Sequence, residues 1–305
     1  MKGVILVENS FVHPYMPNSV PENKKAMLDE LGINSVEDIY KSIIPDELLY
    51  KERLDIPEPI RSEYELKRHV MGILNRDITT EEYTSFLGAG CYKHQVPAIC
   101  DEINSRGEFL TAYCGDTYSD HGKMQAIFEY TSMMGELLDT DVVSYTTYDG
   151  GQAVASSLRM AVRAVREKGM AGKVILVPKT MNPEIYSQVV QYCRNVAEVR
   201  KIAYEPETGL MDLEELKEQL AKKNVAAVFF ENPTYLGNFE TRGEEIAKLA
   251  HDAGAYCVVQ TEVAALGIME SPVNQGADIV CGDIQPLGMH IQFGGGQAGF
   301  IACNQ

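Results

Sequence analysis

Short apolar segments alternate with longer amphipathic segments through the second half of this chain. The apolar segments have the length and β-branched content of strands, and the others carry apolar residues at helical spacing. We predict strands at 142–145, 174–177, 196–203, 226–230 and 256–260, and helices at 152–166, 183–193, 213–221 and 243–253. Strands joined by helices run parallel and need cover on both faces of their sheet. The alternation therefore predicts an α/β fold with three layers, in which helices cover each face of a mostly parallel sheet.

The alternation stops near the end of the chain. Strand candidates at 279–281 and 299–302 follow each other with almost no helix between them, which predicts an antiparallel closing strand. The first eighty residues instead contain short helices: one ends at Gly32, one begins at Ser35, and one begins at Ser62. Their apolar residues need another surface to cover them. We therefore expect residues 1–80 to form a helical N-terminal arm that lies on a body of residues 81–305.

The net charge of −17, from 44 acidic and 27 basic side chains, opposes binding to nucleic acid. No local run of basic residues offsets this charge. The one apolar run near the start, at 4–7, is too short for a signal peptide or a membrane span, so we expect a cytoplasmic protein that does not enter membranes. The seven Cys include no C-x-x-C pair, which is typical of reduced and buried thiols.

Common cofactor and metal motifs are missing from the sequence. The pair Gly88 and Gly90 lacks the third glycine of a dinucleotide fingerprint, and no G-x-x-x-x-G-K-[ST] loop for a nucleoside triphosphate occurs. Apart from His94, which lies three residues after Cys91, no His pairs at helical spacing with another His or Cys, so we predict no metal site. Three polar loops follow predicted strands, at 146–151, 231–237 and 282–288. They are either ligand-binding loops at the carboxyl ends of parallel strands or ordinary tight turns.

Ordered motifs along most of the chain resemble one family. They are HPYMPN at 13–18, SFLGAG at 85–90, EFLTAY at 108–113, QAIFEY at 125–130, YDG at 148–150, NPTYLG at 232–237, GADIV at 276–280 and QPLG at 285–288. In order and spacing they resemble subunit 1, the alpha chain, of glycine decarboxylase, the P-protein of the glycine cleavage system. That family is a branch of the fold-type-I pyridoxal phosphate (PLP) enzymes, so the resemblance implies that 81–305 form their large domain. It also implies a C-terminal truncation, because such chains continue into a small domain that is absent here.

The lysine that binds PLP in this family has no counterpart in this sequence. Its Asn-Leu-His-Lys loop after a late strand falls on 283–286, which places Gln285 at the His and Pro286 at the Lys. Proline cannot form a Schiff base, and no Lys or Arg follows Lys248. By resemblance this is the lysine-free alpha chain, and PLP is expected on a partner beta chain, P-protein subunit 2, and not covalently on this one.

The resemblance also implies roles for particular residues. It places contacts to the partner's active site in the loop after residue 110, at Thr111, Tyr113, Asp116 and His121. It assigns a remnant cofactor pocket to five residues: Asp149, Asn182, Asn232, Glu262 and Gln285. In that pocket Glu262 replaces the Asp that would pair with the PLP ring. No catalytic residue is expected in this chain.

The implied activity is that of subunit 1 of glycine dehydrogenase (aminomethyl-transferring, decarboxylating). Glycine loses CO2, the aminomethyl group passes to the lipoyl arm of H-protein, and this chain shapes the active site within a heterotetramer. The segment 114–122 departs from the family loop and carries Asp116, Asp120 and His121. It either favours a substrate with a cationic or hydrogen-bonding tail or is a solvated acidic loop. Two alternatives therefore stay open: a partner of a PLP decarboxylase for another amino acid, and a non-catalytic scaffold or regulatory pseudoenzyme.

Overall fold

The structure is a computed structural model, and it describes residues 12–50, 52, 55–84, 86, 93–109, 121–292 and 297–304. The contacts within the chain divide it into two units, Met1–Asp77 and Ile78–Gln305. None of the helices in the described ranges is long and apolar enough to cross a membrane. The same ranges contain no group of three or more His, Cys, Asp or Glu that is placed to hold a metal ion.

The first unit contains the helices that the capping residues predict. They are α1 (Pro21–Leu31), α2 (Val36–Lys41) and α3 (Glu63–Leu74), after a short 3-10 turn η1 (Pro17–Ser19). Gly32 ends α1 in the left-handed conformation, at φ 68°. Ser35 and Asp38 form a capping box at the start of α2, and the Ser62 hydroxyl accepts a hydrogen bond from the first turn of α3. The three predicted helices are confirmed.

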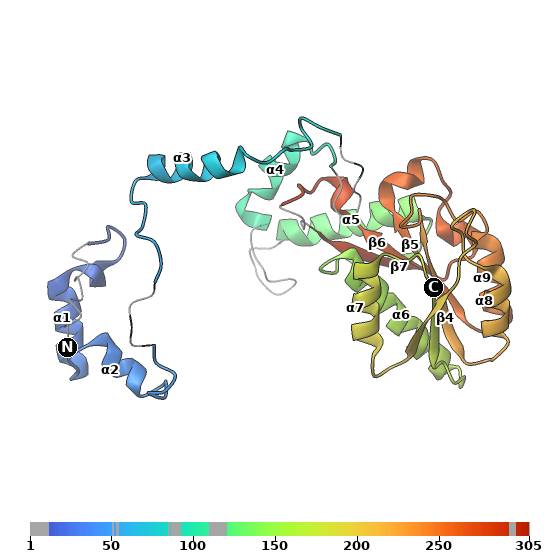
Figure 1. Cartoon of the computed structure of the whole chain (residues 1–305), viewed down its shortest axis with the longest axis horizontal. Helices are drawn as coiled ribbons and strands as arrows, with labels where there is room; N and C mark the ends of the chain where they lie inside the picture. Colours follow the sequence, from blue (N-terminus) through green and yellow to red (C-terminus); the bar gives the residue numbers. More distant parts are fainter. Residues whose placement is uncertain are drawn as a thin grey trace. The chain divides into compact units, whose positions relative to one another are not determined.

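The second unit contains the predicted alternation of strands and helices (Figure 1). Its helices are α4 (Ala98–Asn104), α5 (His121–Leu138), α6 (Gly150–Glu167), α7 (Pro183–Cys193), α8 (Leu213–Leu220) and α9 (Gly243–Asp252). Its strands are β1 (Val142–Val143), β2 (Val174–Pro178), β3 (Glu198–Ile202), β4 (Val225–Asn232), β5 (Tyr256–Glu262), β6 (Ile279–Asp283) and β7 (Gly299–Cys303). Short 3-10 turns are η2 (Gly107–Phe109), η3 (Val263–Gly267), η4 (Pro272–Gln275) and η5 (Gln285–Leu287). The sequence did not predict α4 and α5, but it predicted each of the seven strands that the structure describes.

The seven strands form one sheet in the order β1-β7-β6-β5-β4-β2-β3. Four neighbouring pairs are parallel, as the helical crossovers require: β3 with β2, β2 with β4, β4 with β5, and β5 with β6. Strand β7 runs antiparallel between β1 and β6, with Val142 opposite Cys303 and Asp283 opposite Gly299. The predicted antiparallel closing strand is confirmed, and it joins the first strand of the body to the last parallel one.

Two apolar cores lie on opposite faces of the sheet. In β2, Val174 and Leu176 pack with α8 and α9, whereas Ile175 and Val177 pack with α6 and α7. This alternation follows from the two-residue period of a strand. Figure 1 shows α6 and α7 on one side of the strands and α8 and α9 on the other. The three-layer arrangement is confirmed, and it brings the carboxyl ends of β4, β5 and β6 together at one edge.

Candidate functional site

A cavity of about 690 Å3 opens at the carboxyl edge of the sheet. Its walls come from the ends of β4, β5 and β6, from the first turns of α6 and α7, and from residues 233–237 after β4. Open parallel sheets bind ligands at this edge, where the N-termini of the following helices also lie. Its position and size therefore make this cavity the candidate site of the chain.

Two carboxylates occupy the N-terminus of α6. Asp149 is the N-cap residue, and its side chain accepts a hydrogen bond from the backbone N–H of Gln152. Asp283, at the end of β6, accepts one from the N–H of Gly150 at 3.2 Å. A Cβ on Gly150 would lie 3.2 Å from the Cβ of Asp283, so the close approach of α6 to β6 depends on this glycine. Two of the first three N–H groups of α6, those of Gly150 and Gln152, are therefore already bound by the chain's own acids, and these two carboxylates disfavour an anion here.

Glu231 is a buried acid in the cavity wall, with 5% of its surface exposed. Its carboxylate accepts hydrogen bonds from the backbone N–H of Asn182, at 3.1 and 3.3 Å, and from that of Tyr235. Burial raises the pKa of Glu231 to about 7, although these two backbone hydrogen bonds act in the opposite direction. This carboxyl group therefore changes its charge near neutral pH.

Glu262 and Asp283 lie opposite each other on β5 and β6. The side chain of Glu262 accepts a hydrogen bond from the N–H of Ala264 at 3.3 Å, and Asp283 accepts one from Gln285 at 2.7 Å. Burial raises the pKa of both carboxyl groups, and the charge of Asp283 raises that of Glu262 further. The cavity is therefore suited to groups that donate hydrogen bonds or carry positive charge, and unsuited to anions.

The structure places three of the five predicted pocket residues in the cavity wall, namely Asp149, Asn182 and Glu262. The other two are buried beside it. Asn232 exchanges hydrogen bonds with the backbone of Glu240, at 3.2 and 3.3 Å. Gln285 donates to the backbone oxygen of Met289 at 2.8 Å. The side chains of this second pair are thus engaged with the chain itself, and the cofactor-pocket role of all five stays a prediction.

The predicted contacts to a partner lie outside the described part of the chain. Thr111, Tyr113 and Asp116 fall in 110–120, and the side chain of His121, the first residue of α5, is not described either. Their role also stays a prediction.

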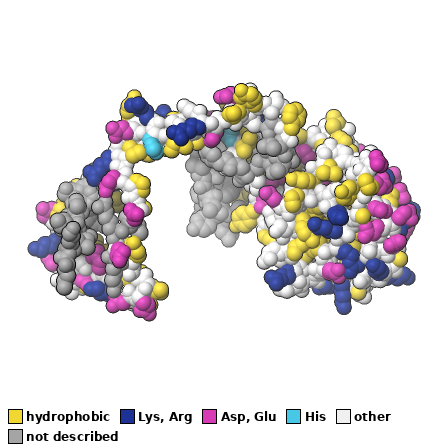
Figure 2. All heavy atoms as spheres, viewed as in Figure 1, with side chains coloured by type: hydrophobic (Ala, Val, Ile, Leu, Met, Phe, Trp, Pro, Cys, Tyr) yellow, Lys and Arg dark blue, Asp and Glu magenta, His cyan; other side chains and the backbone are white. Residues whose placement is uncertain are grey.

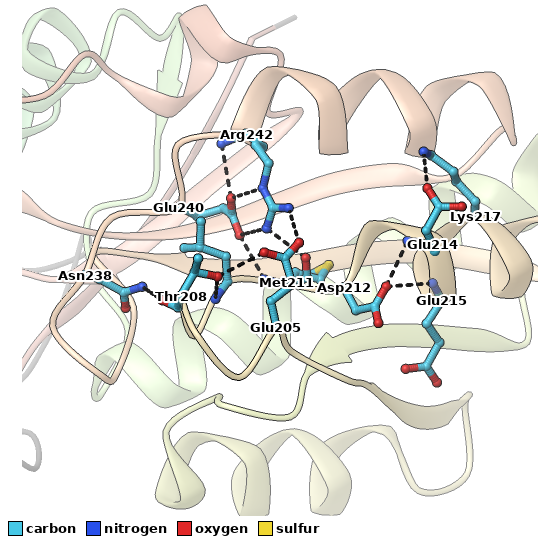
Figure 3. Close-up of polar contacts among 11 residues, drawn as sticks. Glu205, Thr208, Met211, Asp212, Glu214, Glu215, Lys217, Asn238, Glu240 and Arg242 are labelled. Carbon is cyan, nitrogen blue, oxygen red and sulfur yellow. Dashed lines mark hydrogen bonds and ion pairs between the residues drawn. The ribbon is translucent and has the colours of Figure 1, made fainter.

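The wall at 233–237 is anchored by a charged cluster around Arg242 (Figure 3). The Arg242 guanidinium donates to the carboxylates of Glu240 at 3.1 Å and Glu205 at 2.7 Å, and to the backbone oxygen of Met211 at 2.8 Å. Glu240 is 3% exposed and also accepts from the N–H of Met211 at 3.1 Å. Because Glu240 closely follows the wall segment, this cluster fixes the point at which the loop returns to the body.

The residues of the cavity do not fit PLP, the cofactor that the resemblance implies. PLP needs a lysine for its aldehyde and donors for its phosphate. The described lining contains neither Lys nor Arg, but it contains five acids: Asp149, Glu184, Glu231, Glu262 and Asp283. Pro286 lies in η5 directly after β6, where the family lysine is expected, and Lys248 lies on the exposed surface of α9, paired with Asp252. A phosphate ester at α6 would displace two carboxylates and face three more.

The sequence placed Glu231 and Asp283 in two of the three candidate ligand-binding loops but did not single them out as site residues. Both acids follow an apolar run at the end of a parallel strand, and that position is a usable signal for a residue at the ligand edge of the sheet. Their burial depends on the neighbouring strands and helices, so the sequence did not indicate their raised pKa.

Comparisons with known proteins agree with this architecture. The family described as glycine cleavage system P-protein matches residues 13–305. A probable glycine dehydrogenase (decarboxylating) subunit 1 from Staphylothermus marinus is 35% identical over 301 residues, which cover 95% of this chain and 62% of that protein. A protein of the same description from Pyrococcus horikoshii is 38% identical over 290 residues, which cover 94% of this chain and 62% of its own length.

A solved structure matches in the same way. The crystal structure of glycine decarboxylase (P-protein) of the glycine cleavage system, in inhibitor-bound form, superposes with a TM-score of 0.79 at 31% identity. The match covers 97% of this chain and 63% of that one, so the expected fold-type-I large domain is confirmed. This chain spans 62% of the length of each of the two relatives named above. It belongs to the glycine cleavage system P-protein family.

Proposed function

We propose that this chain is subunit 1 of a heteromeric glycine decarboxylase, and that a separate subunit 2 carries the PLP and its lysine. The observation that carries the proposal is the cavity lined by acids, with Pro286 where the family places its lysine. The described lining of this cavity contains neither of the groups that hold PLP, so a chain of this family needs a second subunit for the chemistry. The names of the relatives support this division, because each is described as a subunit 1.

In the proposed complex, glycine is decarboxylated in the site of subunit 2, and lipoylated H-protein receives the aminomethyl group. The contribution of this chain is to shape and close that site. The residues proposed to reach it are Thr111, Tyr113, Asp116 and His121. The five residues of the remnant pocket, Asp149, Asn182, Asn232, Glu262 and Gln285, hold the sheet edge in shape instead of binding a cofactor. We propose a heterotetramer of two copies of each subunit.

Co-expression with subunit 2 tests the proposal. The purified complex is expected to show the absorbance of protein-bound PLP and to exchange bicarbonate with the carboxyl group of glycine when lipoylated H-protein is added. This chain purified alone is expected to show neither signal. A Tyr113→Phe variant is expected to assemble normally and lose part of the exchange rate, whereas Tyr83→Phe, at an exposed tyrosine, serves as the matched control.

Three results would contradict parts of the proposal. Absorbance of a PLP Schiff base from this chain alone would refute the lysine-free assignment. Exchange with another amino acid but not with glycine would select the alternative of a different decarboxylase. Failure of the two subunits to form a complex would favour a scaffold or regulatory role.

A further inference from the structure

The two helical layers of the second unit carry opposite charge. Residues 151–201, from α6 to β3, contain nine basic and three acidic side chains. Residues 205–252, from α8 to α9, contain five basic and eleven acidic ones. Because α6 and α7 pack on one face of the sheet and α8 and α9 on the other, one helical layer is basic and the opposite one acidic. In Figure 2, dark blue side chains gather along the lower side of this unit and magenta ones along its right side.

The sequence predicted no basic patch because five of the basic side chains lie on α6 and β3 and the other four lie in the connections next to α6, β2 and α7. The nine are Arg159, Arg163, Arg166, Lys168, Lys173, Lys179, Arg194, Arg200 and Lys201. No two of them are adjacent in the chain except the last pair. The three arginines of α6 lie on the face that packs with α7, and Lys201 of β3 lies over the ring of Tyr186 on α7. Arg200 faces the other way and donates to the side chain of Gln219 on α8. The prediction that no local basic patch offsets the net charge is therefore corrected at the α6 face of the fold.

A groove of about 600 Å3 lies on this basic layer, between α6 and the end of α7. Arg159, Arg163 and Arg166 follow one side of it at helical spacing. Met160 and Tyr192 also line it, and they are 43% and 39% exposed. Arg, Met and Tyr are the residues enriched at protein interfaces, so the groove has the composition of a contact surface.

Two of the three arginines are held by backbone oxygens instead of carboxylates. Arg159 donates to the backbone oxygen of Tyr192 at 2.8 Å, and Arg166 donates to that of Val196. Within the described ranges neither arginine forms an ion pair. Each guanidinium has five N–H donors, so these contacts fix its position and leave donors for a further acceptor. The positive charges of Arg159 and Arg166 are therefore held in position by backbone oxygens and are not neutralised by a carboxylate.

Arg163 adds a third positive charge on the outer side of the groove. It pairs with Glu167 at 3.0 Å, but both side chains are largely exposed, at 83% and 67%. An ion pair this exposed contributes little to stability, so Arg163 can readily exchange Glu167 for another carboxylate. Arg163 is therefore available to a carboxylate that arrives from outside.

We propose that the groove between α6 and α7 binds an acidic segment of a partner protein. Carboxylates of that segment bind Arg159, Arg163 and Arg166, and an apolar side chain packs against Met160 and Tyr192. An acidic peptide fits better than a nucleic acid, because a long polyanion would run beyond the groove onto a chain whose net charge is −17. A site that binds only phosphates would also make no use of the exposed side chains of Met160 and Tyr192. The proposal is independent of the activity proposed above.

The test uses the full chain and a fluorescein-labelled peptide of alternating Glu and Leu, followed by fluorescence anisotropy. Binding is expected at low salt and should weaken as salt screens the contacts. Arg163→Gln is expected to weaken binding about fivefold, and the double variant Arg159→Gln, Arg163→Gln about twentyfold, on the scale of one exposed ion pair each. The matched control Lys217→Gln removes the same charge from α8 and should change binding less than about twofold.

Further probes separate this proposal from its rivals. A Glu and Gly peptide of the same charge is expected to bind more weakly, because it lacks a group for Met160 and Tyr192. Equal binding of both peptides would overturn the apolar part of the site. Equal weakening by Lys217→Gln and Arg163→Gln would show diffuse attraction, and tighter binding of a short DNA duplex would assign the groove to nucleic acid. Absence of peptide binding to a chain with a native circular dichroism spectrum would overturn the proposal as a whole.

Discussion

Replacement of Glu231 by Gln should change how the stability of this protein depends on pH. In the folded chain the pKa of the Glu231 carboxyl is raised to about 7 by burial, whereas the unfolded chain has the ordinary value of 4.5. The folded state therefore binds a proton more tightly, and the stability that this proton contributes is complete below the unfolded pKa. It is lost as the pH rises through the folded pKa, because the ionised group is then buried without a cation.

The magnitude follows from these two pKa values. Between pH 5 and pH 8, linkage gives a loss of roughly 2–3 kcal/mol in the free energy of unfolding of the natural protein. A glutamine amide at position 231 does not titrate, and its oxygen still accepts hydrogen bonds from the N–H groups of Asn182 and Tyr235. Glu231→Gln should therefore be similar to the natural protein at pH 5 and more stable by roughly 2–3 kcal/mol at pH 8.

Urea unfolding followed by circular dichroism at pH 5, 6, 7 and 8 measures this difference. Glu262 and Asp283 also have a raised pKa, but they titrate in both proteins and cancel in the comparison. Glu184→Gln is the matched control, since Glu184 lines the same cavity from an exposed position on α7. Parallel profiles for the natural protein and Glu231→Gln would refute the assignment of the shift to this residue.

Three further substitutions test the packing around the site. Arg242→Met should lower the free energy of unfolding by roughly 3 kcal/mol, because it leaves the Glu240 carboxylate buried without its cation. Gly299→Ala should cost about 1–3 kcal/mol, since its Cβ would clash with the backbone oxygen of Asp149. Phe229→Ala should cost roughly 3–5 kcal/mol through the cavity it leaves in the core of α6 and α7. Urea denaturation at neutral pH measures all three.

Each of these substitutions has a control of the same kind on the surface. Lys217→Met breaks an exposed ion pair and should cost less than about 1 kcal/mol. Gly267→Ala adds a Cβ with no neighbour within 4 Å, and Phe239→Ala removes a ring that is 37% exposed. If a control were to cost as much as its buried counterpart, the energetic interpretation of that contact would be wrong.

The sequence predicted the order of strands and helices because each element carries its own local signal. Helix α7 begins at Pro183 behind the N-cap Asn182, and its predicted and observed ranges agree. Strands β2 and β4 read as continuous apolar runs, as expected for strands buried on both faces. Helix α5 was missed: its apolar residues are not confined to one stripe, so periodicity gave no clear helical signal.

The candidate site was less predictable, because it depends on which side chains the sheet brings together. Asp149 and Asp283 both lie in loops that the sequence offered as ligand-binding loops. They are more than a hundred residues apart, and only the folded sheet brings them together at the start of α6. Asn232 and Gln285 lie at strand ends as predicted, yet their side chains bond to nearby backbone instead of lining the cavity. The position of a residue along a strand predicts whether it lies near the carboxyl edge of the sheet. Whether its side chain lines the cavity depends on its rotamer and its hydrogen-bond partners.

The antiparallel position of β7 has a consequence for how the body forms during synthesis. Among the strands that the structure describes, β1 pairs with β7 alone. The residues of β1 are therefore synthesised about half a chain before those of their partner. Until Gly299–Cys303 has been made, β6 is an open edge with the buried Val280 and Cys281 beside it. Contacts of such long sequence separation close slowly. We therefore expect the nascent chain to remain open to aggregation and to chaperones until β7 has paired with β6 and β1.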